Sequence, residues 1–227
     1  MWHKRSGVKK ARAAAEFAGP HAAWRAALEA VSLALAIALF YHPIAFSAAL
    51  STGGDLLNLF LPALAWSAET VRGEGIWPLW NPYNFAGHPF AAAAQSAVFY
   101  PPARLFPFAA APARAANAYL ALHLIAAGLG LWAFARARGG LRLRRGAGPW
   151  LAGFLFPCSA WFWGHTEHLA HVAAIAWIPW LLWAAGEWAR GRAAAGAAVA
   201  MITALQLLAG HPQMAFTGWL AAGPWAL

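Results

Sequence analysis

The sequence is poor in charged residues. Only 10% of its 227 residues are Asp, Glu, Lys or Arg, while 62% are apolar, and a soluble domain typically carries about 25% charged residues. So little charge cannot cover an ordinary water-facing surface, which excludes a soluble globular enzyme and a disordered tail. A single cysteine, Cys158, excludes a disulfide scaffold. The sequence is instead rich in Trp, Phe and Gly, and both Gly and Trp are common in membrane proteins.

Long uncharged apolar runs predict the fold class. Runs of about 17–25 residues are typical of membrane-spanning helices. The sequence has five such runs and the start of a sixth, at about 26–50, 117–135, 149–163, 171–189, 193–209 and 214–227. The third run is short and contains Pro157, so we expect a kink or a tilt there. The expected fold is an all-α membrane protein, a polytopic helical bundle of five spans plus a truncated sixth.

The positions of the basic residues predict the orientation. Thirteen of the sixteen Lys and Arg lie in the N-terminal arm, in the loop after the second span or in the loop after the fourth. The opposite side has only Arg72, Arg104 and Arg114. The positive-inside rule then places a basic arm, 1–25, in the cytoplasm, followed by a multispanning domain at 26–227. Basic loops of this kind contact anionic membrane lipids, and we expect no nucleic-acid partner.

The first span has an alternative interpretation as a signal peptide. Basic residues precede it, and Ser47-Ala48-Ala49 has the small residues of a cleavage site. The apolar run is long for a signal peptide, however, and His42-Pro43 interrupts it before that site. We therefore expect an uncleaved membrane anchor.

The longest loop, 51–116, is predicted to lie on the outer side and to carry juxtamembrane helices. It opens with an amphipathic stretch in which Leu56, Leu59, Phe60 and Leu64 recur at helical spacing, as in a helix that lies in the membrane interface. A second short amphipathic piece covers about 91–106. The segment between them is rich in Trp, Pro, Asn and Gly, which predicts an ordered irregular loop.

Polar residues gather in the predicted outer loops, where four of the seven acidic side chains lie: Asp55, Glu69, Glu74 and Glu167. Polar groups that converge at a membrane face indicate a functional site. Asp55 has two compatible interpretations. It has the position of an N-cap before an apolar helix, and it is placed to act as a general base that takes a proton from an acceptor hydroxyl. Glu69 and Glu74, with Arg72 between them, are typical of a solvated patch.

The histidines leave several alternatives open. His165, His168 and His171 are spaced three apart, which predicts imidazoles along one helical face. Such a face suits interfacial hydrogen bonds, a lipid phosphate or a metal ion. No Cys or second carboxylate lies nearby, so we assign no metal ligand and leave a divalent metal open as a cofactor. His123, in the second span, bonds a neighbouring helix or, alternatively, ligates haem.

The outer loop resembles the first external loop of the YfhO-like bacterial membrane protein family. The resemblance rests on Gly54-Asp55, the helix with Pro62, the segment from Gly75 through Asn81-Pro82, Gly87 with Pro89, and Tyr100-Pro101. Two later stretches, GHTEHLAHVAAIAWIPWLLWA and LLAGHPQMAF, are similar to the same family. Together these features extend from about residue 26 to the end of the sequence.

The resemblance implies a glycosyltransferase of the GT-C architecture. Such an enzyme would transfer a sugar from an undecaprenyl-phosphate-linked donor to a cell-envelope glycan, lipid or protein on the outer face of the bacterial cytoplasmic membrane. Asp55 falls where the catalytic acidic residue of the family is expected. The candidate substrate-binding residues are Trp77, Trp80, Asn81, His88, Arg104, His165, Glu167, His168, His211 and Gln213.

GT-C proteins usually have eight or more spans. We therefore expect this chain to be the N-terminal part of a longer protein and to be inactive alone. Two other function classes remain, a transporter or flippase for lipid-linked sugars and a non-catalytic membrane scaffold. A transporter tends to place ionisable residues at mid-membrane, whereas only His123 lies deep here, so the pattern favours the enzyme.

Overall fold

The structure, a computed structural model, describes residues 20–46, 54–109, 111–138 and 147–226, and these ranges are built from helices and turns with one isolated bridge. Most of the predicted cytoplasmic arm lies outside them. The same holds for residues 47–53, which include Ser47-Ala48-Ala49, and for Arg142, Arg144 and Arg145.

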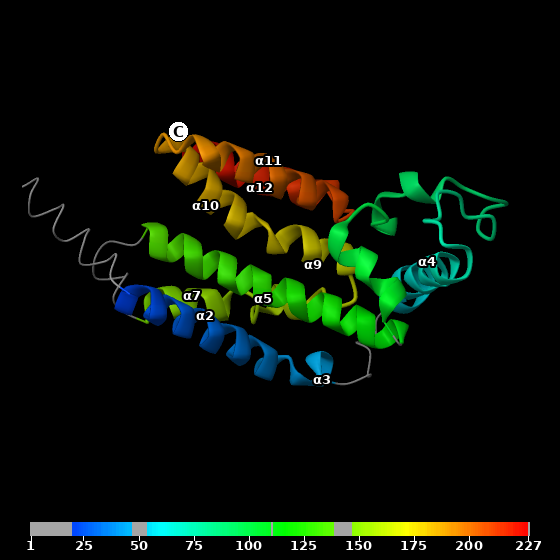
Figure 1. Cartoon of the computed structure of the whole chain (residues 1–227), viewed down its shortest axis with the longest axis horizontal. Coiled ribbons are helices and arrows are strands. Elements are labelled where there is room, and N and C mark those ends of the chain that lie inside the picture. The colour runs from blue at the N-terminus through cyan, green and yellow to red at the C-terminus, as the bar shows by residue number, and fades with distance from the viewer. Residues whose placement is uncertain (1–19, 47–53, 110, 139–146, 227) are drawn as a thin grey trace, which may run out of the picture.

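A bundle of long helices runs along the molecule, with α5 at its centre (Figure 1). The bundle consists of α2 (Pro20–Phe40), α5 (Pro112–Arg138), α9 (Leu169–Ala176), α10 (Ile178–Ala189), α11 (Ala193–Leu208) and α12 (Pro212–Ala226). Helix α5 packs against α2, α9 and α10, and its side chains Leu120 and Leu124 are buried in the main core. Most of the predicted apolar segments are therefore helical, with ends close to those expected. The first differs, because α2 ends at Phe40 whereas the span was expected to extend to about residue 50.

Three apolar helices in the described ranges are long enough to cross a membrane. They are Ala22–Phe40, Pro112–Arg138 and Leu169–Ala189, the last composed of α9 and α10. Helix α2 exposes a stripe of large apolar side chains, Leu28, Val31, Leu35 and Leu39. An apolar stripe of this length is unfavourable in water and favourable against lipid. Helix lengths and exposed apolar surface together indicate a membrane protein.

The third predicted span is broken rather than merely kinked. Helix α7 (Gly148–Leu155) ends before Pro157, and the short α8 (Ala160–Gly164) begins after it. Proline removes a backbone donor and disrupts a continuing helix. The Pro157 carbonyl is satisfied instead by the buried Tyr41 hydroxyl, which donates to it at 2.6 Å. Tyr41 lies between α2 and the single-turn α3 (His42–Ala45).

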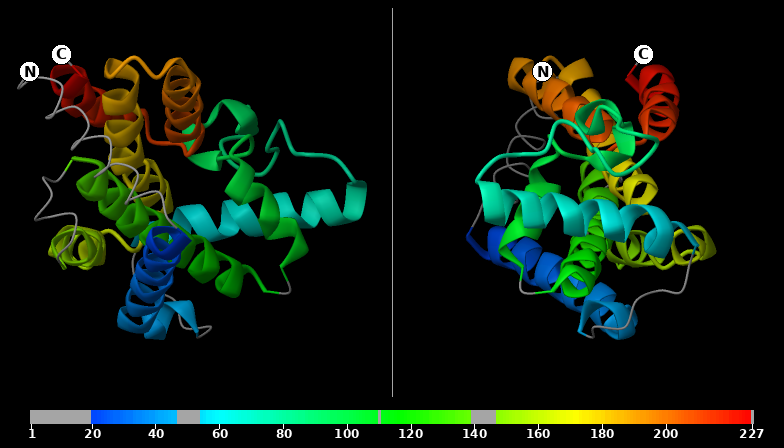
Figure 2. Two further views of the ribbon diagram at one scale, coloured as in Figure 1. Left: turned by 60° about the vertical axis from the view of Figure 1, so that its left-hand side comes forward. Right: turned by 90° about the vertical axis from the view of Figure 1, so that its right-hand side faces the viewer.

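The segment from 54 to 109 covers one end of the bundle. It consists of a π-helical turn η1 (Leu56–Phe60), helix α4 (Leu61–Glu74), and the 3-10 segments η2 (Phe90–Ala92), η3 (Ala94–Ser96) and η4 (Pro101–Phe108). Figure 2 shows α4 lying across the bundle end. The second predicted amphipathic piece is a series of 3-10 turns. Its prolines, among them Pro107, supply no backbone donor for a regular α-helix.

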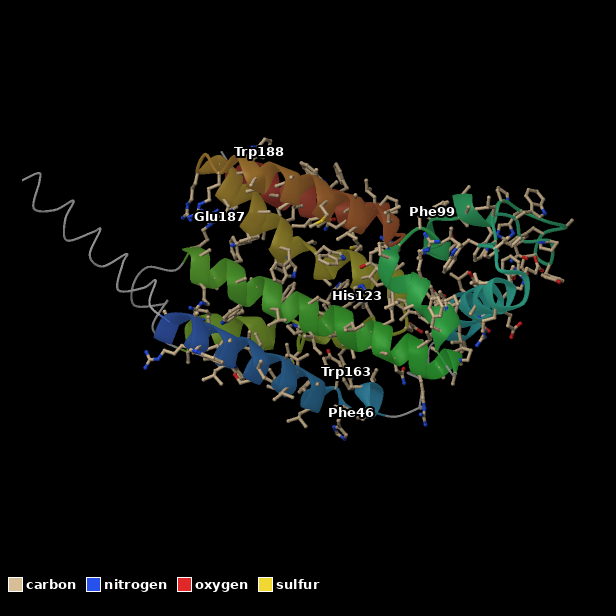
Figure 3. The ribbon with its side chains drawn as sticks, in the orientation of Figure 1. Phe46, Phe99, His123, Trp163, Glu187 and Trp188 are labelled. Carbon is tan, nitrogen blue, oxygen red and sulfur yellow. The ribbon has the colours of Figure 1, made fainter. Side chains whose placement is uncertain are left out.

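Two opposite regions are named by their polar groups. The loop end comprises residues 54–109 with the adjoining segments 164–171 and 209–213. The ionic end lies at the opposite side of the bundle, around Arg136, Glu187, Arg190 and Arg192, where Figure 3 labels Glu187. The candidate site residues predicted from the sequence all belong to the loop end.

Candidate functional site

Asp55 lies inside the helical segment that leads into η1. The N-cap prediction is wrong, because its backbone is helical, with φ −71° and ψ −38°, and its side chain makes no capping hydrogen bond. An N-cap residue has non-helical angles and bonds the amides that follow it. The carboxylate instead faces His168, with its Oδ2 3.3 Å from Nε2, and the side chain is 54% exposed. A half-exposed carboxylate beside an imidazole is accessible to a substrate.

Four histidines lie around this contact: two from the turn between α8 and α9, one from α9, and one from the turn between α11 and α12. The prediction that His165, His168 and His171 share one helical face is wrong, because His165 ends α8 and His168 precedes α9. The turn nonetheless brings the rings together: the His168 and His171 centroids are 4.9 Å apart, and His165 is 5.4 Å from His168. His211, from the turn between α11 and α12, lies with its ring centroid 3.6 Å from that of His171.

We call His165, His168, His171 and His211 the histidine cluster. Burial, with a further contribution from nearby His168, lowers the pKa of His211. Glu167 lies 3.9 Å from His168 Nε2. Within the described part of the chain, no three His, Cys, Asp or Glu side chains are arranged to hold a metal ion.

A pocket of about 610 Å³ opens at the loop end. We call it the amide pocket, because its lining includes Asn58, Asn81, Asn84, Gln95 and Gln213, together with Ser96, His88, His211, Trp66 and Tyr83. Four predicted substrate-binding residues, Asn81, His88, His211 and Gln213, therefore share one cavity although they lie up to 132 positions apart in the sequence. The histidine cluster adjoins the pocket through His211, which belongs to both.

The pocket wall is held by specific backbone contacts. Asn81 and His88 exchange both backbone hydrogen bonds at 2.9 Å, which closes the loop between them. The Asn81 side-chain oxygen accepts a bond from the Tyr83 amide at 2.9 Å. Trp66 of α4 stands edge-on to Phe90, with ring centroids 4.9 Å apart. Gly210, which also lines the pocket, has φ +97°. It lies so close to Gln95 that a Cβ added to Gly210 would be 3.0 Å from the Gln95 Cα.

The predicted tryptophans lie elsewhere. Trp77 and Trp80 line a second hollow of about 560 Å³ with Pro78, Thr70 and Glu74. The two hollows share the side chains of Trp66 and Tyr83, but Trp77 and Trp80 do not line the amide pocket. The Arg104 guanidinium stacks on the Trp77 ring at 4.2 Å from its centroid, a cation–π contact. The structure thus groups Arg104 with Trp77, and neither residue lines the amide pocket.

His123 lies midway along the bundle and is fully hydrogen-bonded (Figure 3). Its Nδ1 donates to the Tyr119 carbonyl at 2.6 Å, which leaves Nε2 to accept from the Tyr100 hydroxyl at 2.7 Å. Trp177 donates to the same hydroxyl at 2.8 Å. Both ring nitrogens are therefore engaged within the protein, and the haem alternative does not fit. The partner outside α5 is Tyr100, which directly precedes η4, and not a residue of a neighbouring helix as predicted.

Sequence reasoning missed several polar and aromatic lining residues, among them Asn58, Trp66, Asn84 and Gln95. A signal was present, because Asn and Gln are rare in the chain, but it carries no spacing that a local motif would reveal. The site is thus defined by its own geometry: a half-exposed carboxylate, a histidine cluster and an uncharged polar pocket on one end of the bundle.

The chain matches no protein-family model, no curated protein and no solved structure.

Proposed function

We propose that this protein is a membrane glycosyltransferase of the YfhO-like, GT-C kind. It would transfer a sugar from an undecaprenyl-phosphate-linked donor to a cell-envelope glycan, lipid or protein. The observation that carries the proposal is the position of Asp55, half exposed at the loop end and 3.3 Å from His168, beside a pocket of about 610 Å³. Ligand sites are typically concave, with a few polar groups that fix orientation.

In the proposed reaction, Asp55 acts as the general base. The acceptor hydroxyl loses its proton to the Asp55 carboxylate while its oxygen attacks the anomeric carbon of the donor sugar. A bond forms between that carbon and the acceptor oxygen, and the bond between the same carbon and the phosphate oxygen breaks. Polyprenyl phosphate leaves, with its new negative charge stabilised by a hydrogen bond from an imidazole N–H such as that of His168.

The architecture in this proposal has more spans than the three membrane-length helices. We propose that α2 with α3, α5, α7 with α8, α9 with α10, and α11 form five spans, and that α12 begins a sixth. The unequal distribution of Lys and Arg supports a cytoplasmic N-terminus in the bacterial inner membrane. The loop end would then face the outer side, where lipid-linked sugars and envelope acceptors meet.

The proposal is tested by sugar transfer in membranes that contain the protein expressed from its entire reading frame. Radiolabelled sugar on undecaprenyl phosphate is supplied, and its release from the carrier and its appearance in acceptor are measured. Asp55→Asn is expected to reduce transfer by about 10²–10⁴-fold, the range typical of a lost general base. The matched control is Glu69→Gln, the same exchange on the exposed side of α4, which should leave transfer unchanged.

Two results would contradict the proposal. Unchanged turnover in Asp55→Asn would remove Asp55 from the mechanism. Movement of the intact lipid-linked sugar across the membrane, with no sugar released, would favour the transporter or flippase class instead. A non-catalytic scaffold predicts neither transfer nor transport.

A further inference from the structure

The amide side chains of the chain converge on one place. The whole sequence has seven of them: Asn58, Asn81, Asn84, Asn117, Gln95, Gln206 and Gln213. Five of the seven line the amide pocket, and they come from η1, the loop after α4, η3 and the start of α12. The other two are buried in the bundle. Because no helix periodicity brings these five together, their meeting is a property of the folded loop end.

The lining of the pocket carries no formal charge. Among the described residues that line it, none is Asp, Glu, Lys or Arg. The titratable lining groups are His88, His211 and the phenol of Tyr83, and burial together with His168 lowers the pKa of His211, which favours its neutral form. A phosphate or carboxylate that left water for this pocket would meet no cation to offset its desolvation.

Neutral hydroxyl groups are the complementary chemistry. A primary amide offers donors and acceptors side by side, and a hydroxyl both donates and accepts. Two lining atoms, Nδ1 of His88 and Nδ1 of His211, are buried and have no hydrogen-bond partner in the protein. A buried polar atom without a partner is costly, and a ligand hydroxyl would satisfy each of them.

The pocket also has an aromatic wall. The Trp66 ring is held edge-on by Phe90 and by Tyr83, whose centroids lie 4.9 and 6.2 Å away. The electron-rich face of an indole attracts the weakly positive C–H groups of a saturated ring. The pocket volume of about 610 Å³ lies within the range of small-molecule sites.

We infer that the amide pocket binds an uncharged saccharide unit, with its hydroxyls on the amides and its C–H face on Trp66. This inference rests on the proposed function in taking the ligand from a glycan. It adds that the bound unit is neutral and that the phosphate of the donor lies outside this pocket. Charged sugars, such as uronic acids and free amino sugars, are excluded by the same uncharged lining.

Binding is tested on the protein in lipid nanodiscs free of glycoside detergent, at pH 7.5. Titration calorimetry and saturation-transfer NMR compare methyl β-glucoside and N-acetylglucosamine with glucuronate, glucose 1-phosphate and inorganic phosphate. We expect the neutral sugars to bind at least about tenfold tighter than the anions, because an unpaired buried charge is costly. Equal or tighter binding of the anions, or no binding of any neutral sugar, would overturn the inference.

Variants locate the binding. Gln213→Glu places a carboxylate at the exposed rim of the pocket, and it should weaken neutral sugars by about threefold to tenfold through lost and mismatched hydrogen bonds. Trp66→Ala should abolish measurable binding. Should the alanine variant fold poorly, Trp66→Phe keeps a smaller aromatic wall and should weaken the binding without abolishing it. Glu69→Gln, a reverse exchange outside the lining, is the control. Neutral-sugar affinity that is the same in Gln213→Glu and Trp66→Phe as in the wild type would contradict this location.

A failure of the saccharide-binding inference can be distinguished from a failure of the proposed transferase activity. Asp55 does not line the pocket, so Asp55→Asn should keep neutral-sugar binding while transfer is lost. Binding without any transfer in the wild type would refute the glycosyltransferase and leave the saccharide site. Transfer without neutral-sugar binding would refute the saccharide site in the amide pocket and leave the glycosyltransferase proposal.

Discussion

The two ends of the bundle use their polar side chains differently. At the ionic end, arginines neutralise the carboxylates: the buried Glu187 pairs with Arg190 at 3.0 Å and with Arg192, and Glu29 pairs with Arg136 at 2.5 Å. At the loop end, Asp55 faces an imidazole and the adjoining pocket is lined by amides. The ionic end thus pairs its carboxylates internally, whereas the loop end presents neutral polar groups to a partner.

The buried groups left without partners sharpen this contrast. At the ionic end they are Nε and Nη2 of Arg138, which are cationic, and at the loop end they are Nδ1 atoms of His88, His168, His171 and His211. A leftover guanidinium suits an anionic headgroup, while leftover imidazoles suit hydroxyl groups. The difference predicts a lipid headgroup phosphate beside Arg138 at the ionic end and a neutral ligand in the amide pocket at the loop end.

The largest difference in stability between the ends should come from two glycines. Gly210 has φ +97° and is packed against the backbone of Ala94 and Gln95, whereas Gly191 has φ +82° and open space within 4 Å of the position that a Cβ would take. Gly210→Ala should destabilise the protein by about 3 kcal/mol, through strain plus a backbone clash. Gly191→Ala should cost about 1 kcal/mol. Thermal unfolding of the two variants measures this, and equal costs would contradict the close packing at the pocket wall.

A second comparison concerns the carboxylates. Glu187→Gln should destabilise by about 1–2 kcal/mol, less than for a wholly buried pair because Arg190 and Arg192 are 49% and 72% exposed and return to water. Asp55→Asn removes a half-exposed contact and should cost less than about 1 kcal/mol. Chemical denaturation of both variants provides the measurement. A larger loss for Asp55→Asn would mean that Asp55 serves the fold, which would weaken its assignment as a base.

The smallest effect should be a pH dependence confined to the loop end. Because the pKa of His211 is lowered in the folded protein, the unfolded chain takes up its proton first as the pH falls. Stability should therefore decline below about pH 6.5, the ordinary pKa of histidine, and the decline should continue to the lowered folded value. Melting temperatures from pH 8 to pH 5 test this.

The control for that experiment is His211→Gln, which should flatten part of the pH dependence. Glu187→Gln should leave the slope unchanged, because its arginine partners do not titrate in this range. A slope that is unaffected by His211→Gln would assign the pH dependence to other groups.

Much of the helical framework was predictable from local sequence. The apolar run at 117–135 falls within α5, and the run at 193–209 coincides closely with α11, because a helix satisfies its own backbone and needs only a continuous apolar segment to be recognised. The break at Pro157 was foreshadowed by the proline. The sequence did not predict that the helix would break completely, because the Tyr41 hydroxyl that satisfies the Pro157 carbonyl lies 116 residues away.

The site was predictable only in part. Asn81, His88, His211 and Gln213 were identified as binding residues, and they do share one pocket. The prediction grouped Trp77, Trp80 and Arg104 with them. In the structure the two tryptophans line a second hollow, and Arg104 forms a cation–π pair with Trp77. Residue type indicates what a side chain is able to bind, but not which other side chains the loop will bring beside it.

The sequence by itself determined that this is a helical protein with membrane-length apolar segments, because scarcity of charge and length of apolar runs are properties of consecutive residues. It also determined which scarce polar residues were available. Only the tertiary structure decided that five amides meet in one uncharged pocket and that four histidines gather beside Asp55. It also decided that Trp77 and Trp80 lie outside that pocket. Those outcomes depend on how α4, the 3-10 segments and the turns before α9 and α12 pack together, and no local pattern encodes that packing.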